Sequence, residues 1–241
     1  MTLRSTEVLR VRHVKDRLER ARALILDVDG TLAETEEAHR QAFNDAFAQS
    51  GLDWCWGRSV YKQLLRVAGG KERIRAFDRM RQTDAPLSDL DIAELHRVKT
   101  ERYVELISAG GCPLRPGVEA LLRAAEKRGQ QLAIATTTSR ANIDALLRVA
   151  LGQDWASRFA AIVAGDDVPL KKPAPDVYFE VLARLALAGS DCIAIEDSGN
   201  GVVAAALAGI PVVITRSVYF RDEVFSNALI AVDDLLVFSE V

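Results

Sequence analysis

Residues 23–32 read Ala-Leu-Ile-Leu-Asp-Val-Asp-Gly-Thr-Leu, and the architecture of the chain can be worked out from them. The apolar run Ala23–Leu26 is typical of a strand buried on both faces, as in a parallel sheet. Asp27 and Asp29 follow it, and strand side chains two positions apart lie on the same face. Neighbouring carboxylates repel each other, so we expect both to face one small space that holds a hard cation such as Mg²⁺. For this motif alone, a polar strand end that turns at Gly30 is the alternative.

The composition is that of a globular protein. The chain has 241 residues, of which 49% are hydrophobic and 27% charged, and its formal net charge is -3. This balance gives no reason to expect a nucleic-acid partner or a membrane surface. The three cysteines, Cys55, Cys112 and Cys192, are far apart and lack histidines at metal-ligand spacing, so we expect reduced thiols in a cytoplasmic protein. We expect neither a secretory signal nor a membrane span.

After Pro113 the chain alternates between short apolar runs and helical patterns. This alternation predicts a Rossmann-like, doubly wound parallel α/β sheet, in which ligands bind outside the carboxyl ends of the strands. The strands expected after Ala23–Leu26 are Gln131–Ala135, Ala160–Ala164, Cys192–Ile195, Val212–Ile214 and Leu229–Val232. The helices expected between them are Gly117–Arg128, Arg140–Leu151, Asp176–Leu187 and Gly201–Ala208.

Residues 35–112 carry helical patterns and no strand signal, which predicts a small all-helical cap inserted after the first strand. Its expected helices are Glu36–Ser50, a stripe over 60–67, Lys71–Met80, and Leu90–Ile107 with Ser88 or Asp89 as N-cap.

The predicted organisation therefore has three parts. An N-terminal extension covers residues 1–22, the core domain covers 23–34 and 113–241, and the cap covers 35–112. For the extension we expect a short exposed helix that has no part in the chemistry.

Polar residues stand where the predicted strands end. Four hydroxyls follow the second strand, at Thr136, Thr137, Thr138 and Ser139, and Glu196 and Asp197 follow the fourth. Lys172 precedes a helix within Lys-Lys-Pro. Carboxylates with a divalent cation, a lysine, and hydroxyls at a helix start together suit phosphoryl transfer. Each segment alone would be an ordinary N-cap, surface turn or solvated strand end.

These four segments, in this order and spacing, resemble the haloacid dehalogenase-like hydrolase superfamily. The resemblance runs from about Ala23 to Asp233. It implies that Asp27 is the nucleophile and forms an aspartyl-phosphate. It implies that Asp29 protonates the leaving oxygen and then takes a proton from the hydrolytic water. An acid at Asp29 favours a phosphatase or phosphomutase over a dehalogenase or an ion-pumping ATPase.

The same resemblance assigns the remaining core groups. Thr136 would hold the phosphoryl group, and Lys172 would neutralise the charge that builds on it. Mg²⁺ would be bound by Asp27, by the backbone carbonyl of Asp29 and by Asp197. Glu196 would be either a direct or an indirect ligand of the cation.

The cap adds further polar groups. Glu36 and His39 share a helix face, and His96 and Lys99 share another. Lys71 and Arg73 stand in the first turn of a helix, where cations oppose the helix dipole unless an anion binds there. These groups suggest a second anion site, as a sugar with two phosphates would need; the alternative is a solvated cap face.

With the cap included, the chain resembles the CbbY group more closely. The matching stretches are residues 27–37, 69–74, 96–102 and 135–139. Members of this group are phosphatases that degrade xylulose-1,5-bisphosphate, an inhibitor of Rubisco in the Calvin cycle. The resemblance implies that the bisphosphate contacts Glu36, His39, Gly69, Gly70, Lys71, Glu72, Arg73, His96, Lys99, Thr137, Thr138, Ser139, Arg140 and Asn142.

Three other readings remain open at this point. A sugar phosphomutase of the β-phosphoglucomutase type would use the same core. A phosphoglycolate phosphatase would leave the cations of the cap unused. A non-catalytic sugar-phosphate-binding protein would keep the fold without turnover, which the presence of Asp27, Asp29, Lys172 and Asp197 disfavours. The expected partner is a small sugar phosphate, and the expected assembly is a monomer.

Overall fold

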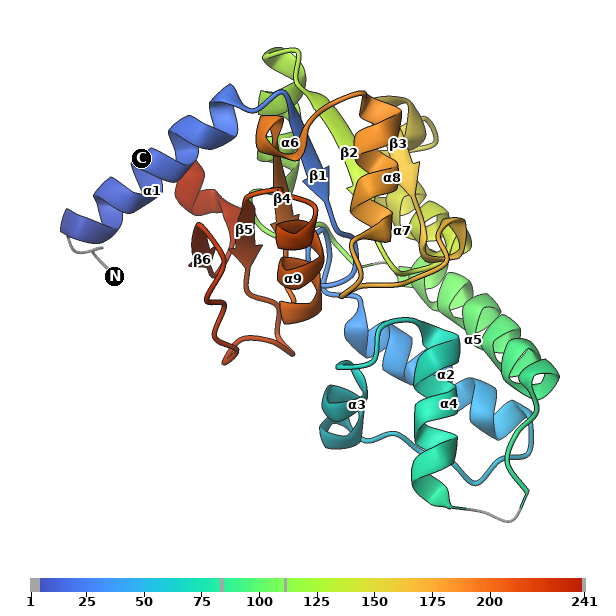
Figure 1. Ribbon diagram of the computed structural model, residues 1–241. Helices are drawn as coiled ribbons and strands as arrows, with labels where there is room; N and C mark the ends of the chain where they lie inside the picture. The colour runs from blue at the N-terminus through green and yellow to red at the C-terminus, as the bar shows by residue number, and fades with distance from the viewer. Residues whose placement is uncertain (1–4, 83–84, 111, 240–241) are drawn as a thin grey trace.

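The computed structural model describes residues 5–82, 85–110 and 112–239, so residues 1–4 of the predicted extension, 83, 84 and 111 of the predicted cap, and 240–241 of the predicted core domain lie outside it. Its sheet has six parallel strands in the order β3-β2-β1-β4-β5-β6, as Figure 1 shows. This confirms the predicted doubly wound α/β fold. The strands are β1 (Ala23–Leu26), β2 (Gln131–Ala135), β3 (Ala161–Val163), β4 (Cys192–Glu196), β5 (Val212–Thr215) and β6 (Ile230–Val232).

The α-helices of the described residues follow the predicted pattern closely. The cap contains α2 (Glu36–Gln49), α3 (Arg58–Leu64), α4 (Gly70–Arg81) and α5 (Asp89–Gly110). The others are α1 (Ser5–Arg20), α6 (Val118–Lys127), α7 (Arg140–Leu151), α8 (Asp176–Leu185) and α9 (Gly199–Leu207). Short 3₁₀ turns that the sequence did not predict are η1 (Trp155–Arg158), η2 (Gly165–Asp167), η3 (Gly189–Asp191) and η4 (Leu235–Phe238).

Helices cover both faces of the sheet, which explains why its strands are apolar throughout. Alternate residues of β1 point to opposite faces: Leu24 and Leu26 join one hydrophobic cluster, and Ala23 and Ile25 join the other. The first cluster includes side chains of α1, α6 and α7, and the second includes those of α8 and α9. The sheet is therefore the middle layer of three (Figure 1).

The cap has an aromatic core of its own. Phe43 and Phe47 of α2 pack against Trp54 and Trp56, with ring centroids 4.6–5.3 Å apart in the closest pairs. Tyr219, from the loop after β5, belongs to the same cluster although it comes from the core domain. The cap is thus anchored to the core through an aromatic contact as well as through the chain itself.

Helix α5 links the cap to the core. Its N-cap is Ser88, whose Oγ accepts from the backbone N–H of Asp91 (3.2 Å) while the Asp91 carboxylate accepts from the Ser88 N–H (2.9 Å). This reciprocal pair fixes the helix start. Further along the helix, Ile92 belongs to the aromatic cluster of the cap, whereas Tyr103 and Ile107 belong to the core cluster. In terms of packing, the boundary between cap and core therefore falls inside α5.

The structure corrects our expectation for the N-terminal helix. Helix α1 has 16 residues, and its apolar side is buried rather than exposed. Val11, Val14 and Leu18 are all part of the core cluster, and α1 lies beside β6 and η4 (Figure 1). The sequence pattern was only loosely amphipathic, so the burial could not be predicted from it.

None of the helices in the described part of the chain combines the length and hydropathy that a membrane span needs.

A pair of leucines in α1 tests this packing. Leu18 is 4% exposed and Leu9 is 65% exposed. We expect Leu18→Ala to lower the free energy of unfolding by about 2–5 kcal/mol, because it leaves a cavity beside the sheet. Leu9→Ala, the matched control, should change it by less than about 0.5 kcal/mol. Equal effects in urea unfolding would show that α1 is not part of the folded core.

Candidate active site

The register of the sheet brings the polar strand ends together. Leu26 of β1 is level with Ile134 of β2 and with Ile195 of β4. Asp27 and Glu196 therefore meet at the carboxyl edge of the sheet, where parallel α/β sheets bind ligands.

Lys172 is the centre of this edge. Its ammonium group donates to Asp27 Oδ1 (2.7 Å), Glu196 Oε1 (2.5 Å) and the carbonyl oxygen of Ala135 (2.8 Å). An ammonium has three protons, so all of its donors are satisfied. Burial opposes the charge on Lys172, but Asp27 and Glu196 outweigh that effect and raise its pKa. Lys172 is thus a permanent cation at the bottom of the site.

The acidic residues outnumber this single cation. Asp27, Glu196 and Asp197 are all buried, and each has an oxygen within 4.8 Å of the others. Burial, against the opposing charge of Lys172, raises the pKa of Asp27 to about 7, and burial followed by the charge of Asp27 raises that of Asp197. Asp197 Oδ2 is buried without a hydrogen-bond partner. A hard divalent cation fits such an arrangement, because it would satisfy that oxygen and offset the repulsion.

The three carboxylates are not equally available to a cation. Glu196 Oε1 already accepts from Lys172 and from the hydroxyl of Tyr178 (2.6 Å). Asp27 and Asp197 keep free oxygens. Gly30 has φ +78°, and a Cβ there would come within 2.0 Å of Asp197 Oδ2, so only glycine leaves room for this carboxylate.

Asp29 does not share the space of Asp27 in the way we expected. The strand ends at Leu26, so strand alternation does not extend to these residues. The Asp29 carboxylate instead accepts from Thr35 Oγ1 (2.6 Å) and lies 3.0 Å from His39 Nε2. It is not among the clustered carboxylates of the described residues.

Asp29 is connected to the cap through His39. Lys99 Nζ lies 2.6 Å from His39 Nδ1, and burial lowers the pKa of both groups, that of Lys99 to about 7. A neutral imidazole that accepts at Nδ1 must donate at Nε2, so the chain of hydrogen bonds runs from Lys99 through His39 to Asp29. Burial alone would raise the pKa of Asp29, but His39 and Thr35 together hold it well below its usual range. Asp29 is therefore ionised in this arrangement.

A polar pocket between cap and core opens above Asp29. It includes most of the predicted substrate-contacting residues. These are Glu36, His39, Gly69, Gly70, Lys71, Arg73, His96, Lys99, Thr137, Thr138, Ser139 and Asn142. Asp27, Thr136, Glu196 and Asp197 are buried at the strand ends, and Lys172, also buried, reaches them from the segment before α8.

Two predicted residues are not among those that line the pocket. Arg140 bonds instead to the carbonyl of Ile162 (2.9 Å) and to Asp167 (3.0 Å), on the β3 side of the core. Glu72 forms an ion pair with Lys171. Arg73 does line the pocket, but its guanidinium donates to Tyr61 (3.2 Å) inside the cap.

The sequence reasoning missed several contributors. Asp166 and Lys171 line the pocket from the core side. Asp166 follows β3, so it could have been predicted from the polar residues at the end of that strand, as Asp27 and Glu196 were for theirs. Lys171 belongs to the same Lys-Lys-Pro segment, of which only Lys172 was predicted to have a role. Tyr178 carries no motif that would single it out, and Thr35 lies within the matching stretch 27–37 but was given no role.

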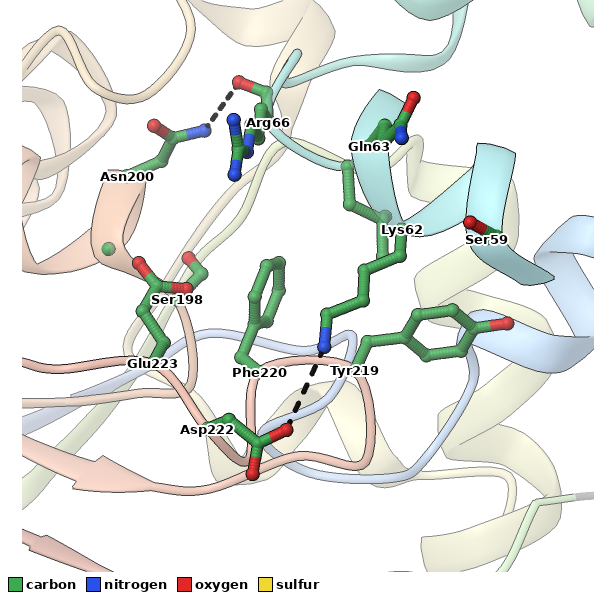
Figure 2. Close-up of a pocket in the computed structure, with 12 residues that line it drawn as sticks. Ser59, Lys62, Gln63, Arg66, Ser198, Asn200, Tyr219, Phe220, Asp222 and Glu223 are labelled. Atoms are coloured by element: carbon green, nitrogen blue, oxygen red, sulfur yellow. Dashed lines mark hydrogen bonds and ion pairs between the residues drawn. The ribbon is translucent and has the colours of Figure 1, made fainter.

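A larger crevice of about 710 Å³ lies elsewhere between cap and core (Figure 2). It contains none of the predicted site residues. Lys62 of α3 faces Asp222 across it (4.0 Å), and Asn200 of the core donates to the carbonyl of Arg66 (3.1 Å). These contacts tie the cap to the core away from the carboxylate cluster.

Substitution of Asp197 tests the cation site without an activity assay. In EDTA, Asp197→Asn should raise the thermal midpoint by a few degrees, because it removes a buried carboxylate that repels Asp27 and Glu196. The same variant should lose the midpoint increase that Mg²⁺ gives the unsubstituted protein. Asp16→Asn, on the exposed side of α1, is the control and should behave like the unsubstituted protein. A full Mg²⁺ shift in Asp197→Asn would rule out this site.

The raised pKa of Asp27 makes the metal-free protein sensitive to pH. The carboxyl has a pKa of about 7 in the folded protein, against the ordinary value of 3.8 expected in the unfolded chain. This contribution to stability is therefore complete below about pH 4 and is lost as the pH rises to about 7. In EDTA, we expect the free energy of unfolding, measured in urea, to fall between about pH 5 and about pH 8. It should fall less in Asp27→Asn than in the unsubstituted protein, because an amide does not titrate in this range. An equal fall in the free energy of unfolding in both proteins would show that the pKa of Asp27 is not raised in the folded protein.

Comparison with known proteins identifies the family. The family model of haloacid dehalogenase-like hydrolases matches residues 21–209. The plasmid protein CbbY of Cupriavidus necator is 52% identical over 216 residues, 88% of this chain and 85% of that protein. Protein CbbY of Rhodobacter capsulatus is 51% identical over 214 residues, covering 89% and 93%.

A solved structure gives the same result. A mutant CbbY from Rhodobacter sphaeroides, crystallised in complex with xylulose-1,5-bisphosphate, is 45% identical with a TM-score of 0.86, over 91% of this chain and 96% of that one. The predicted family and the prediction of a phosphoric monoester hydrolase are confirmed. The chain belongs to the haloacid dehalogenase-like hydrolases, where it is a relative of the CbbY proteins.

Proposed function

We propose that the chain is a Mg²⁺-dependent phosphatase that hydrolyses xylulose-1,5-bisphosphate to xylulose-5-phosphate and phosphate. The observation that carries the proposal is the buried Asp27 carboxylate, held at 2.7 Å by Lys172 below a pocket with several cations. The complex of a 45% identical CbbY with this bisphosphate supports the choice of substrate. As part of the proposal, the enzyme acts in the cytoplasm as a monomer and removes an inhibitor of Rubisco.

In the first step, an Asp27 carboxylate oxygen attacks the phosphorus of the substrate. The bond between phosphorus and the sugar oxygen breaks, and that oxygen takes a proton from Asp29. Lys172 remains beside Asp27 and offsets the negative charge of the phosphoryl group, while Thr136 offers its hydroxyl to a phosphoryl oxygen. Asp27, Asp197 and the carbonyl of Asp29 would hold Mg²⁺, which would supply further charge neutralisation.

In the second step, water attacks the phosphorus of the aspartyl-phosphate. Asp29 takes a proton from the water, the bond to the Asp27 oxygen breaks, and phosphate leaves. The ionised state of Asp29 suits this role directly. To act as an acid in the first step, Asp29 must exchange its bonds to Thr35 and His39 for the leaving oxygen, because those bonds stabilise the carboxylate.

A panel of phosphate esters tests the proposal. With Mg²⁺, we expect phosphate release from xylulose-1,5-bisphosphate to exceed that from ribulose-1,5-bisphosphate, β-glucose-1-phosphate and phosphoglycolate by at least about tenfold in kcat/KM. Asp27→Asn, shown to be folded by circular dichroism, is the control and should release none, because an amide cannot act as the nucleophile.

Two outcomes would overturn the proposal. Conversion of glucose-1-phosphate to glucose-6-phosphate with slow phosphate release throughout would make the enzyme a mutase. Binding of sugar phosphates without any turnover would make it a binding protein.

A further inference from the structure

Two ion pairs cross the pocket between cap and core. Lys171 of the core lies 3.3 Å from Glu72 of α4, and Lys71 of α4 lies 3.5 Å from Asp166 of the core. Each pair joins the two domains. The core supplies the lysine of the first pair, and the cap supplies the lysine of the second. Both lysines and Asp166 line the pocket, beside the predicted substrate contacts Lys99 and His96.

These pairs are loose and therefore replaceable. Nitrogen–oxygen distances of 3.3 and 3.5 Å are at or beyond the long end of hydrogen bonding. The side chains of Glu72 and Asp166 are 39% and 59% exposed, and pairs of this kind contribute little to stability. A phosphate dianion in the same place would offer more charge and more acceptor oxygens.

Basic side chains cluster at this part of the pocket. His96 packs against Gly70, where a Cβ would come within 2.5 Å of its ring. Burial, followed by the charges of Lys99, Lys71 and Lys171, lowers the pKa of His96 to about 3. Three lysine side chains thus act on one neutral imidazole, which can itself donate to an anion.

We propose that Lys171 is a specificity-determining residue. Together with Lys71 it binds the second phosphate of a bisphosphate, and its ion pair with Glu72 breaks when it does so. The proposal rests on the function proposed above. Lys172 holds Asp27 below, while Lys171 reaches the cap, so adjacent lysines of one loop serve the two phosphates. A substrate with one phosphate leaves the pair of Lys171 with Glu72 in place.

Lys171→Met is tested on two substrates that differ only by the second phosphate. For xylulose-1,5-bisphosphate, KM should rise about 10- to 100-fold with kcat within about threefold, because one charge-assisted contact is lost. For xylulose-1-phosphate, both constants should change less than about twofold. Lys171→Arg should recover most of the loss.

Lys62→Met is the matched control. It also removes a lysine that pairs across the domain interface, but in the other crevice (Figure 2), and should leave the kinetics with both substrates unchanged. An equal rise in KM for both substrates in Lys171→Met, or no change for the bisphosphate, would overturn the role of Lys171. If the unsubstituted protein releases phosphate from neither substrate, the proposed function fails instead.

Glu72→Gln tests the exchange itself. Removing the competing carboxylate should lower KM for the bisphosphate by about two- to tenfold and leave xylulose-1-phosphate unaffected. A KM that stays the same or rises would show that Glu72 does not occupy the place of the phosphate. This variant also keeps the proposal testable if Lys171→Met does not fold.

Discussion

One buried ammonium group holds the site together. Lys172 bonds to Asp27 after β1, to the carbonyl of Ala135 in β2 and to Glu196 in β4, and so joins three neighbouring strands at their carboxyl ends. Its single charge cannot balance the three buried carboxylates around it. The excess negative charge makes the apoprotein less stable than an apolar core would be, and it makes the same edge receptive to a cation. The burial of these carboxylates lowers the stability of the fold, but it also creates the site for a cation that the proposed chemistry needs.

The second acid, Asp29, depends on the cap. Thr35, His39 and Lys99 form the hydrogen-bonded chain that keeps it ionised, and Tyr103 stacks on His39 with ring centroids 4.0 Å apart. All four residues belong to the segment inserted between β1 and α6. The protonation of the proposed acid is therefore tied to the position of the cap, whereas the proposed nucleophile, Asp27, is held by Lys172 of the core domain.

Much of this was readable from the sequence, because the signals were local. Buried strands, polar strand ends and glycine-bounded helices are each decided within a few residues, and the structure confirms their order. The orientation of Asp29 was not readable, since it depends on bonds to Thr35 and His39 that form only once the cap is placed. The burial of α1 was missed for a similar reason, because the helix packs against β6 and η4, which come from the far end of the chain. The partnership of Lys171 with Glu72 joins residues 99 positions apart.

Helix α5 has a practical consequence for protein engineering. Its first half packs in the cap and its second half packs in the core, with Tyr103 and Ile107 in the core cluster. A chimera that exchanges caps between relatives at residue 112 would import a foreign half-helix into the core of the host. A junction within α5, before Tyr103, would leave Tyr103 and Ile107 in the core of the host and bring in only the part of the helix that packs in the cap.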